Sequence, residues 1–534
     1  MKKALLLAML AGILFNGCRR SETWEEINHP TGWINYPIET NVTITYWLPM
    51  SEKVTPNFIN YSFTPMGKEL TEQTGININW IHPPATATAA NEQFNLMVAA
   101  DDLPDVFVRD LHRLYPGGPQ KAIEDKVILQ LNDIFNSYAP NLLAFLNANP
   151  DIDKMIKTDT GAYYCFPFIR YEPELRIFLG PLIRQDWLDE LGLDMPQTID
   201  DWYSVLTAFK NRKGSPAPFT FEYTNLTYYE TLPFALAFDA PSRFFIGEDG
   251  VVRFGPIEDG RRDFLRTFAR WYREGLIDPD LVTLRNQQVG SKMVSGTSGA
   301  SFGALGSRMG AWITAALPTN PTYNLVAAPY PVLRRGDSPK MTATEIAFTG
   351  VGSASISAKC RYPQIAARLL DWAYSEEGHM FNNFGIEGES YIMVDGYPVF
   401  TDFIFSNPNG WTVDQSIAAF ARAASDGPLI QDIRYQEQMF TYQVQRDAVK
   451  LWSIEGAENF VLPPITPTPR ESQDLARIMN EIRTYRDEME VRFILGMEQL
   501  TDAAWENYIN TIRRMGIDQA LEIQNAALAR YNAR

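Results

Sequence analysis

Cysteine and histidine are scarce in this chain of 534 residues, which contains three cysteines and four histidines. His29, His82, His112 and His379 are dispersed, and none has the His-x3-His or Cys-x2-Cys spacing of a zinc site. The Gly-x4-Gly-Lys-Ser/Thr loop that cradles nucleotide phosphates is also missing. The sequence therefore contains no motif typical of a transition-metal site or of ATP binding, and we predict neither a metal nor a cofactor.

Long apolar runs are also rare, and the most prominent one lies at the start of the chain. Two lysines precede an apolar segment at 4–15, which leads to Gly17 and Cys18 and is too short to span a membrane as a mature helix. This pattern indicates a signal peptide at 1–17. Because it resembles a bacterial lipoprotein signal, it also predicts lipidation of Cys18, with palmitate as an expected acyl group, and plain secretion is the alternative. The polar residues 18–40 are typical of a tether.

Positive charge is in deficit, since 47 Lys and Arg face 64 Asp and Glu, for a formal net charge of −17. An acidic body argues against nucleic acid or anionic lipid as the main partner. We therefore expect an extracytoplasmic protein, in a periplasm or at a cell surface, that meets the membrane only through its N-terminal lipid. An oxidising compartment permits a disulfide between Cys165 and Cys360, but their sequence separation leaves the pairing open.

Short strands and helices alternate after the tether. Strands are expected at 42–47, 76–80 and 105–108, with helices at 66–74 and around 94–98 between them. This order is typical of an α/β fold with a parallel sheet, which binds ligands beyond the carboxyl ends of its strands. Trp47 and Asp105 are expected at or near such ends.

A second compact unit follows. Residues 183–210 predict two helices, the second capped by Thr198, and amphipathic helices are also expected at 264–274 and 502–514. Glycines recur at 290–312, which favours a flexible surface loop, the alternative being a backbone that approaches a ligand or moves.

Two features bear on activity. Carboxylate pairs occur at 101–102, 200–201 and 376–377, and a glycosidase needs two carboxylates across its substrate, although adjacent helical residues point to different sides. Aromatic residues make up 13% of the chain, and rings flanked by polar groups suit sugars. A secreted carbohydrate-active enzyme is therefore one hypothesis, and a sugar-binding protein is the other.

Several ordered segments together resemble bacterial extracellular solute-binding proteins that serve ABC transporters for oligosaccharides, in the large lipoprotein branch described as aldouronate or polysaccharide-fragment binding. These segments lie at 67–75, 102–106 (Asp-Leu-Pro-Asp-Val), 183–210, 271–279, 371–378, 384–388 (Phe-Gly-Ile-Glu-Gly), 493–496 and 505–523. The resemblance implies a two-lobed α/β periplasmic-binding-protein fold (type II) with a ligand cleft between the lobes and a helical C-terminal region. It implies a non-enzymatic monomer that captures an oligosaccharide and delivers it to permease subunits.

From the resemblance we expect lobe 1 at 41–165 and 345–400, and lobe 2 at 166–344 and 401–534. The ligand-binding residues that it implies are Trp47, Asp105, Tyr163, Arg170, Glu387 and Tyr391, to which aromatic and polar character adds Glu222, Tyr223 and Trp312. Relatives often carry a calcium loop after the helix that here ends near Phe209. This chain has the cationic segment 211–218 there, which supplies no carboxylates, so we predict no calcium at that loop.

Overall fold

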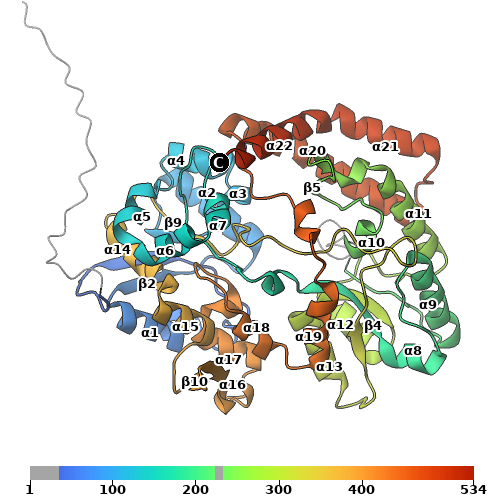
Figure 1. Ribbon diagram of the computed structural model, residues 1–534, viewed down its shortest axis with the longest axis horizontal. Helices are drawn as coiled ribbons and strands as arrows, with labels where there is room; N and C mark the ends of the chain where they lie inside the picture. The colour runs from blue at the N-terminus through green and yellow to red at the C-terminus, as the bar shows by residue number, and fades with distance from the viewer. Residues whose placement is uncertain (1–34, 223–231) are drawn as a thin grey trace, which may run out of the picture.

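The computed structural model describes residues 35–222 and 232–534 (Figure 1). The predicted signal peptide, Cys18, most of the tether and Tyr223 lie outside the described residues. Within those two ranges no helix is long and apolar enough to cross a membrane. Among the described residues, the apolar side chains form one large core in lobe 1 and two large cores with a smaller one in lobe 2, which confirms the predicted two-lobed α/β fold.

The lobe 1 sheet has the strand order β2-β1-β3-β9. Its strands are β1 (Thr43–Trp47), β2 (Asn77–Ile81), β3 (Val106–Val108) and β9 (Ala354–Ile356). β1 runs parallel to both β2 and β3, as the alternation of strands and helices predicts, whereas β9 runs antiparallel to β3. Helix α1 (Pro65–Thr74) ends at Gly75, whose φ of 70° is the left-handed conformation that terminates a helix.

Later parts of the chain complete lobe 1. Its core includes side chains from Phe166 to Ile169 and from Ile404 to Tyr435. The sequence places both stretches in lobe 2, but the chain first leaves the lobe 1 core after Ile169 and finally leaves it only after Tyr435. The hairpin of β10 (Tyr391–Val394) and β11 (Tyr397–Phe400) projects from this lobe. The other helices of lobe 1 are α2 (Ala87–Ala100), α3 (Leu111–Leu114), α4 (Gly118–Glu124), α5 (Asn132–Tyr138), α6 (Pro140–Ala148), α7 (Pro150–Met155), α14 (Pro363–Asp371), α15 (Glu376–Phe384), α16 (Asp402–Phe405), α17 (Val413–Phe420) and α18 (Ile433–Met439).

Lobe 2 is built on a sheet with the order β7-β4-β8, in which β4 (Leu179–Arg184) runs antiparallel to β7 (Ala300–Ala304) and β8 (Leu325–Ala327). A small hairpin joins β5 (Phe244–Ile246) and β6 (Val252–Phe254). Thr198 caps α9 in a capping box with Asp201, as predicted. The helices of lobe 2 are α8 (Gln185–Leu191), α9 (Ile199–Arg212), α10 (Leu232–Leu236), α11 (Asp259–Arg273), α12 (Asn286–Ser295), α13 (Ala311–Ala316), α19 (Gln443–Trp452), α20 (Pro469–Ile494), α21 (Asp502–Arg514) and α22 (Ile517–Asn532).

The glycine-rich segment 290–312 is not the flexible surface loop that the sequence favours. It forms the end of α12, the strand β7, a π-helix at Leu305–Gly310 and the start of α13. Its glycines make room for large neighbours, because a Cβ at Gly299 would lie 2.4 Å from the Trp187 ring, and one at Gly290 would lie 2.7 Å from Nε1 of Trp312. The glycines therefore serve close packing in the lobe 2 core.

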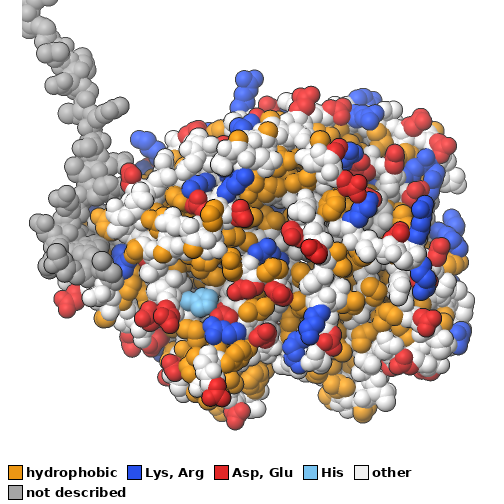
Figure 2. All heavy atoms as spheres, viewed as in Figure 1, with side chains coloured by type: hydrophobic (Ala, Val, Ile, Leu, Met, Phe, Trp, Pro, Cys, Tyr) orange, Lys and Arg blue, Asp and Glu red, His pale blue; other side chains and the backbone are white. Residues whose placement is uncertain are grey.

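Over the described residues the chain crosses between the lobes three times, at 170–176, at 344–346 and after α18, as the membership of the cores shows. On the visible face of the molecule acidic and basic side chains are interspersed, and the lower edge is notched between the lobes (Figure 2). Cys165 and Cys360 are both buried free thiols, so the disulfide left open by the sequence is not formed.

Candidate functional site

Both sheets present strand ends at the boundary between the lobes. In lobe 1, β9 begins shortly after the second crossing, and its Ala354 pairs with Val108, the last residue of β3. In lobe 2, β4 begins just after the first crossing, and its Leu179 pairs with Ala304, the last residue of β7. The carboxyl ends of β3 and β7 therefore lie at the boundary, which is where α/β sheets bind ligands.

Arg109 follows directly after β3 and is the least satisfied charged group at this edge. Its side chain is 7% exposed, its guanidinium lies 4.3 Å from the centre of the Phe94 ring, and burial lowers its pKa. Nε of Arg109 has no hydrogen-bond partner in the part of the chain that the structure describes. A buried guanidinium is costly without an acceptor, so this group is suited to bind an anionic or hydroxylated ligand.

Asp110 lies next to Arg109 and caps α3 by accepting a hydrogen bond from the backbone N–H of Arg113. Burial raises the pKa of Asp110, while His112 and Arg113 act in the opposite direction. A Cβ at Gly350 would lie 2.7 Å from Oδ1 of Asp110, and the φ of 86° at Gly350 also favours glycine. His112 Nε2 is 2.5 Å from the carbonyl oxygen of Ile465 in lobe 2, so this edge of lobe 1 faces lobe 2.

Lobe 2 contributes an ion pair at the corresponding place. The segment that ends at Glu222 runs parallel to β7, since Phe219 pairs with Ala300. Arg308, on the π-helix after β7, donates to the carbonyl of Phe302 and lies 3.5 Å from the Glu222 carboxylate. The structure therefore places Glu222, a predicted ligand-binding residue, at the carboxyl edge of the lobe 2 sheet. Arg308 was missed by the sequence reading.

Arg170 lies in the first crossing and forms hydrogen bonds to the second crossing and to the segment before the third. Its NH1 donates to Oε2 of Glu345 at 2.6 Å, and its Nε donates to Oε1 of Gln431 at 3.2 Å. NH2 of Arg170 lies 3.8 Å from Oδ1 of Asp426. The residue predicted as a ligand-binding group is thus a member of the hinge.

Three other predicted residues have structural contacts within lobe 1. Trp47 is 1% exposed, packs against Phe94, and donates to Gln93, so its ring does not reach the surface. Asp105 lies at the amino end of β3, not the carboxyl end, and its carboxylate accepts from the N–H and hydroxyl of Thr45. Tyr163 is buried against Phe135 and donates to Asp153. The rings of Trp47, at the end of β1, and of Tyr163, at an isolated bridge to Lys157, resemble site aromatics in sequence, but both pack into the lobe 1 core.

The remaining three predicted residues divide between core and surface. Trp312 is buried in the lobe 2 core on α13. Tyr391 is buried at the start of β10, its ring 5.8 Å from that of Phe384, whereas Glu387 is exposed in the preceding turn. Burial, followed by the charge of Glu387, raises the pKa of Tyr391.

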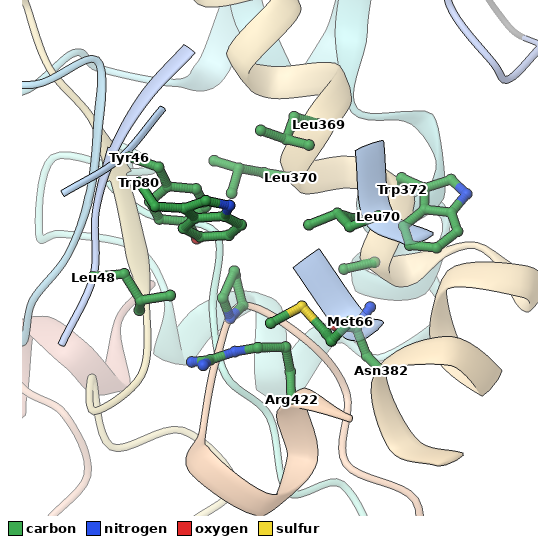
Figure 3. Close-up of a pocket in the computed structure, with 12 residues that line it drawn as sticks. Tyr46, Leu48, Met66, Leu70, Trp80, Leu369, Leu370, Trp372, Asn382 and Arg422 are labelled. Atoms are coloured by element: carbon green, nitrogen blue, oxygen red, sulfur yellow. The ribbon is translucent and has the colours of Figure 1, made fainter. Parts of the chain in front are cut away.

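Lobe 1 also contains two hollows of very different size. The smaller, about 40 Å³, lies between the stacked rings of Tyr46 and Trp80 and the side chains of Met66, Leu370 and Arg422 (Figure 3). Such a volume holds a water molecule and no sugar. The larger, about 710 Å³, lies between the β10–β11 hairpin and the aromatic side chains of Phe403 and Phe420.

Two features bear on catalysis and metals. Residues 299–303 have the Gly-x-Ser-x-Gly spacing of a hydrolase elbow, but Ser301 is fully buried inside β7 and pairs with Leu182, so it does not lie on a strand-to-helix turn. In the loop at 211–218, Lys213 pairs with Glu190 at 2.6 Å, and across the described ranges no group of three metal-ligating residues is found.

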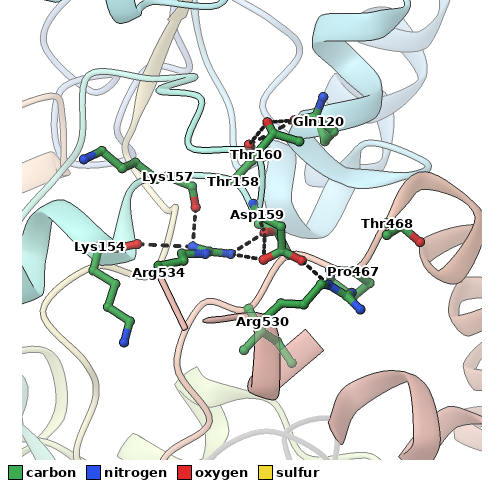
Figure 4. Close-up of polar contacts among 12 residues, drawn as sticks. Gln120, Lys154, Lys157, Thr158, Asp159, Thr160, Pro467, Thr468, Arg530 and Arg534 are labelled. Carbon is green, nitrogen blue, oxygen red and sulfur yellow. Dashed lines mark hydrogen bonds and ion pairs between the residues drawn. The ribbon is translucent and has the colours of Figure 1, made fainter. Parts of the chain in front are cut away.

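A second contact joins the lobes far from the crossings in the sequence, and we call it the clasp (Figure 4). Asp159 of lobe 1 accepts from Arg530 and from Arg534, each at 2.5 Å. Arg530 lies in the last turn of α22, and Arg534 follows the helix. Arg530 also donates to Glu471 at 2.5 Å. Arg534 donates to the backbone carbonyl of Lys157 as well. The clasp therefore fixes the end of α22 on lobe 1 through charged hydrogen bonds.

Comparison with known proteins bears on the family and the fold of the chain. The family model described as bacterial extracellular solute-binding protein matches residues 57–380. This chain belongs to that family. Lipoprotein LipO of Bacillus subtilis (strain 168) is 23% identical over 545 residues, which cover 98% of each chain. In structure, the chain is similar to the alginate-binding protein AlgQ2 solved without calcium ion, with a TM-score of 0.76 and 24% identity over 93% of this chain and 100% of that one.

The fructooligosaccharide ABC transporter substrate-binding protein FusA of Streptococcus pneumoniae serotype 4 (strain ATCC BAA-334 / TIGR4) is 25% identical over 296 residues. That match covers 52% of this chain and 53% of FusA, so the chain spans about half the length of this relative. The fold and family that the sequence predicts are thereby confirmed.

Proposed function

We propose that this protein captures an oligosaccharide between its lobes and delivers it to an ABC permease, held at the membrane by a lipid on Cys18. The family relation supports a binding role, and the names of FusA and AlgQ2 describe carbohydrate ligands of those proteins. The observation that carries the site is Arg109 at the carboxyl end of β3, a buried residue whose Nε has no acceptor among the described residues.

The ligand class we assign is an oligosaccharide that carries carboxylates. A carboxylate provides the bidentate acceptor that a guanidinium prefers, and Arg109 lies next to Asp110 and three positions before His112, which contacts lobe 2. Across the boundary, Glu222 and Arg308 supply hydrogen-bonding groups for sugar hydroxyls. Hinge closure about the three crossings would then surround the ligand with groups from both lobes.

A thermal-shift screen that compares uronate-bearing with neutral oligosaccharides tests this proposal. A ligand that binds only the folded state raises its stability with concentration. We expect uronate oligosaccharides to raise the melting temperature, and Arg109→Met to weaken that response at least tenfold. Arg477→Met, at an exposed arginine on α20 of lobe 2, is the control and should respond as wild type.

Three outcomes separate the parts of the proposal. An equal response to neutral sugars would refute the acidic ligand class but keep oligosaccharide binding. No response to any sugar would refute carbohydrate binding. Conversion of the sugars into products at catalytic rates would favour the carbohydrate-active enzyme. For the anchor, Cys18→Ser should move the protein from the membrane fraction to the soluble fraction, and unchanged retention would refute lipidation.

A further inference from the structure

The β10–β11 hairpin carries an unusual run of exposed apolar side chains. Ile392, Met393 and Val394 are consecutive and are 45%, 42% and 45% exposed, and Phe405 on α16 is 41% exposed. Successive strand residues point to opposite faces, so both faces of β10 are open to solvent. Asp395 and Gly396, with φ of 52° and 80°, close the hairpin in a tight turn and make it project from lobe 1.

The edge of β10 is free beyond its first residue. β10 pairs with β11 in a two-stranded sheet, Tyr391 alone bridges back to Glu387, and no third strand joins that sheet in the described part of the chain. The larger hollow, about 710 Å³, lies beside it and is lined by Ile392, Phe400, Phe403 and Phe420. An exposed strand edge next to an apolar hollow is a surface that accepts an added peptide segment.

The surroundings of this surface are acidic. From residue 369 to residue 421 the sequence contains no Lys or Arg. Glu387, Glu389, Asp395 and Asp402 are exposed around the hairpin, and none of them forms an ion pair within residues 35–222 and 232–534. An anionic lipid surface and a second copy of this chain would both be repelled, which leaves a partner that is apolar and basic.

We infer that the β10–β11 hairpin and α16, which lie together at the lower tip of lobe 1 in Figure 1, form a docking surface for a membrane permease. The occupant is an exposed permease segment with apolar side chains flanked by Lys or Arg. The apolar side chains fill the hollow, and the basic ones meet the acidic rim. This inference rests on the proposed function, because it takes the permease as the partner that membrane transport requires.

The role of this surface in docking can be measured with the reconstituted permease. Purified permease in nanodiscs is titrated with this protein loaded with its sugar, and the stimulated ATP hydrolysis gives a half-saturating concentration. Ile392→Asp combined with Val394→Asp should raise that concentration at least tenfold, while sugar affinity by calorimetry and the melting temperature stay as in wild type. Met497→Asp, an apolar residue of lobe 2 that is 71% exposed, is the control and should leave the titration unchanged.

The outcomes distinguish the two proposals. Wild-type titration by the double variant, with normal sugar binding, would overturn the docking surface and leave the proposed function intact. An equal loss in Met497→Asp would also overturn it, because the effect would not be specific to the hairpin. Absence of sugar binding in the wild-type protein would refute the proposed function and the docking surface with it.

Discussion

The crossings and the clasp both join the lobes, but different forces hold them. At the crossings the backbone itself links the two lobes. Arg170 adds hydrogen bonds to Glu345 and Gln431 at a place where the lobes are already connected. The chain does not cross at the clasp, where Arg530 and Arg534 donate to the Asp159 carboxylate and Arg534 also donates to a backbone carbonyl of lobe 1. The angle between the lobes should therefore respond more to the clasp charges than to the hinge charges.

Removal of the central clasp carboxylate should have the largest effect. Asp159→Ala leaves Arg530 and Arg534 without their shared acceptor, and Arg534 is largely buried. We expect the free energy of unfolding in urea to fall by about 3 kcal/mol. Asp159→Asn, which keeps one acceptor oxygen, should lose less, and a loss below about 0.5 kcal/mol in Asp159→Ala would show that the clasp does not hold the lobes.

The corresponding hinge variant should lose less stability and leave the lobe angle unchanged. Arg170→Met removes the counter-charge of Glu345 at the crossings, which should cost about 2 kcal/mol. Small-angle scattering should give a wild-type radius of gyration for Arg170→Met and a larger one for Asp159→Ala. The reverse pattern would mean that the crossings, and not the clasp, set the lobe angle.

The two regions should also respond to pH with opposite sign. Burial opposes ionisation of Glu471, but hydrogen bonds from Arg530 and Thr468 hold the pKa of Glu471 below its usual value. Its contribution is present above the unfolded pKa of about 4.3 and is lost as pH falls through the folded pKa. Near the hinge, burial raises the pKa of Glu172, whose Oε2 has no partner in the described ranges. Its contribution is present below the unfolded pKa and is lost as pH rises.

Melting temperatures of two glutamine variants check this contrast. At pH 7, Glu172→Gln should stabilise the protein by about 1 kcal/mol, because it removes the charge of a half-buried carboxylate whose Oε2 has no hydrogen-bond donor among the described residues. Glu471→Gln should destabilise the protein. Near pH 4 both differences should shrink. Stabilisation by both variants at pH 7 would contradict the opposite signs.

An exposed ion pair should show the smallest effect and calibrate the others. Arg270 and Glu274 pair at 3.0 Å one turn apart on the surface of lobe 2. Glu274→Gln should change the free energy of unfolding by about 0.5 kcal/mol or less. A loss as large as that of Asp159→Ala would mean that the clasp is an ordinary surface pair.

Local patterns predicted much of the fold. The first three strands, α1, α8 and α9 follow from periodicity and capping, which act within a few residues. The prediction for 290–312 was wrong because its glycines make room for large rings in the folded core, such as that of Trp187, which lies more than a hundred positions before Gly299 in the sequence. The late return to lobe 2, after Tyr435, depends on core packing between distant segments, which a local sequence pattern does not predict.

The site was harder to predict, for a physical reason. Trp47, Tyr163 and Trp312 are aromatic in sequence, and aromatic residues serve cores as readily as sugar sites. The rule that ligands lie beyond carboxyl strand ends does lead to Arg109 and Asp110, one residue past the strand that was predicted at 105–108. Glu222 stays a predicted ligand-binding residue, and its ion pair with Arg308 emerges only from the tertiary fold.

The central claim is that an oligosaccharide binds between the lobes and draws them together. Small-angle scattering of the wild-type protein, with and without a saturating sugar taken from the thermal-shift screen, measures this most directly. The account predicts that the radius of gyration falls when the sugar binds, and that Arg109→Met abolishes the change at the same sugar concentration. A sugar that binds tightly with no change in the radius of gyration would contradict it.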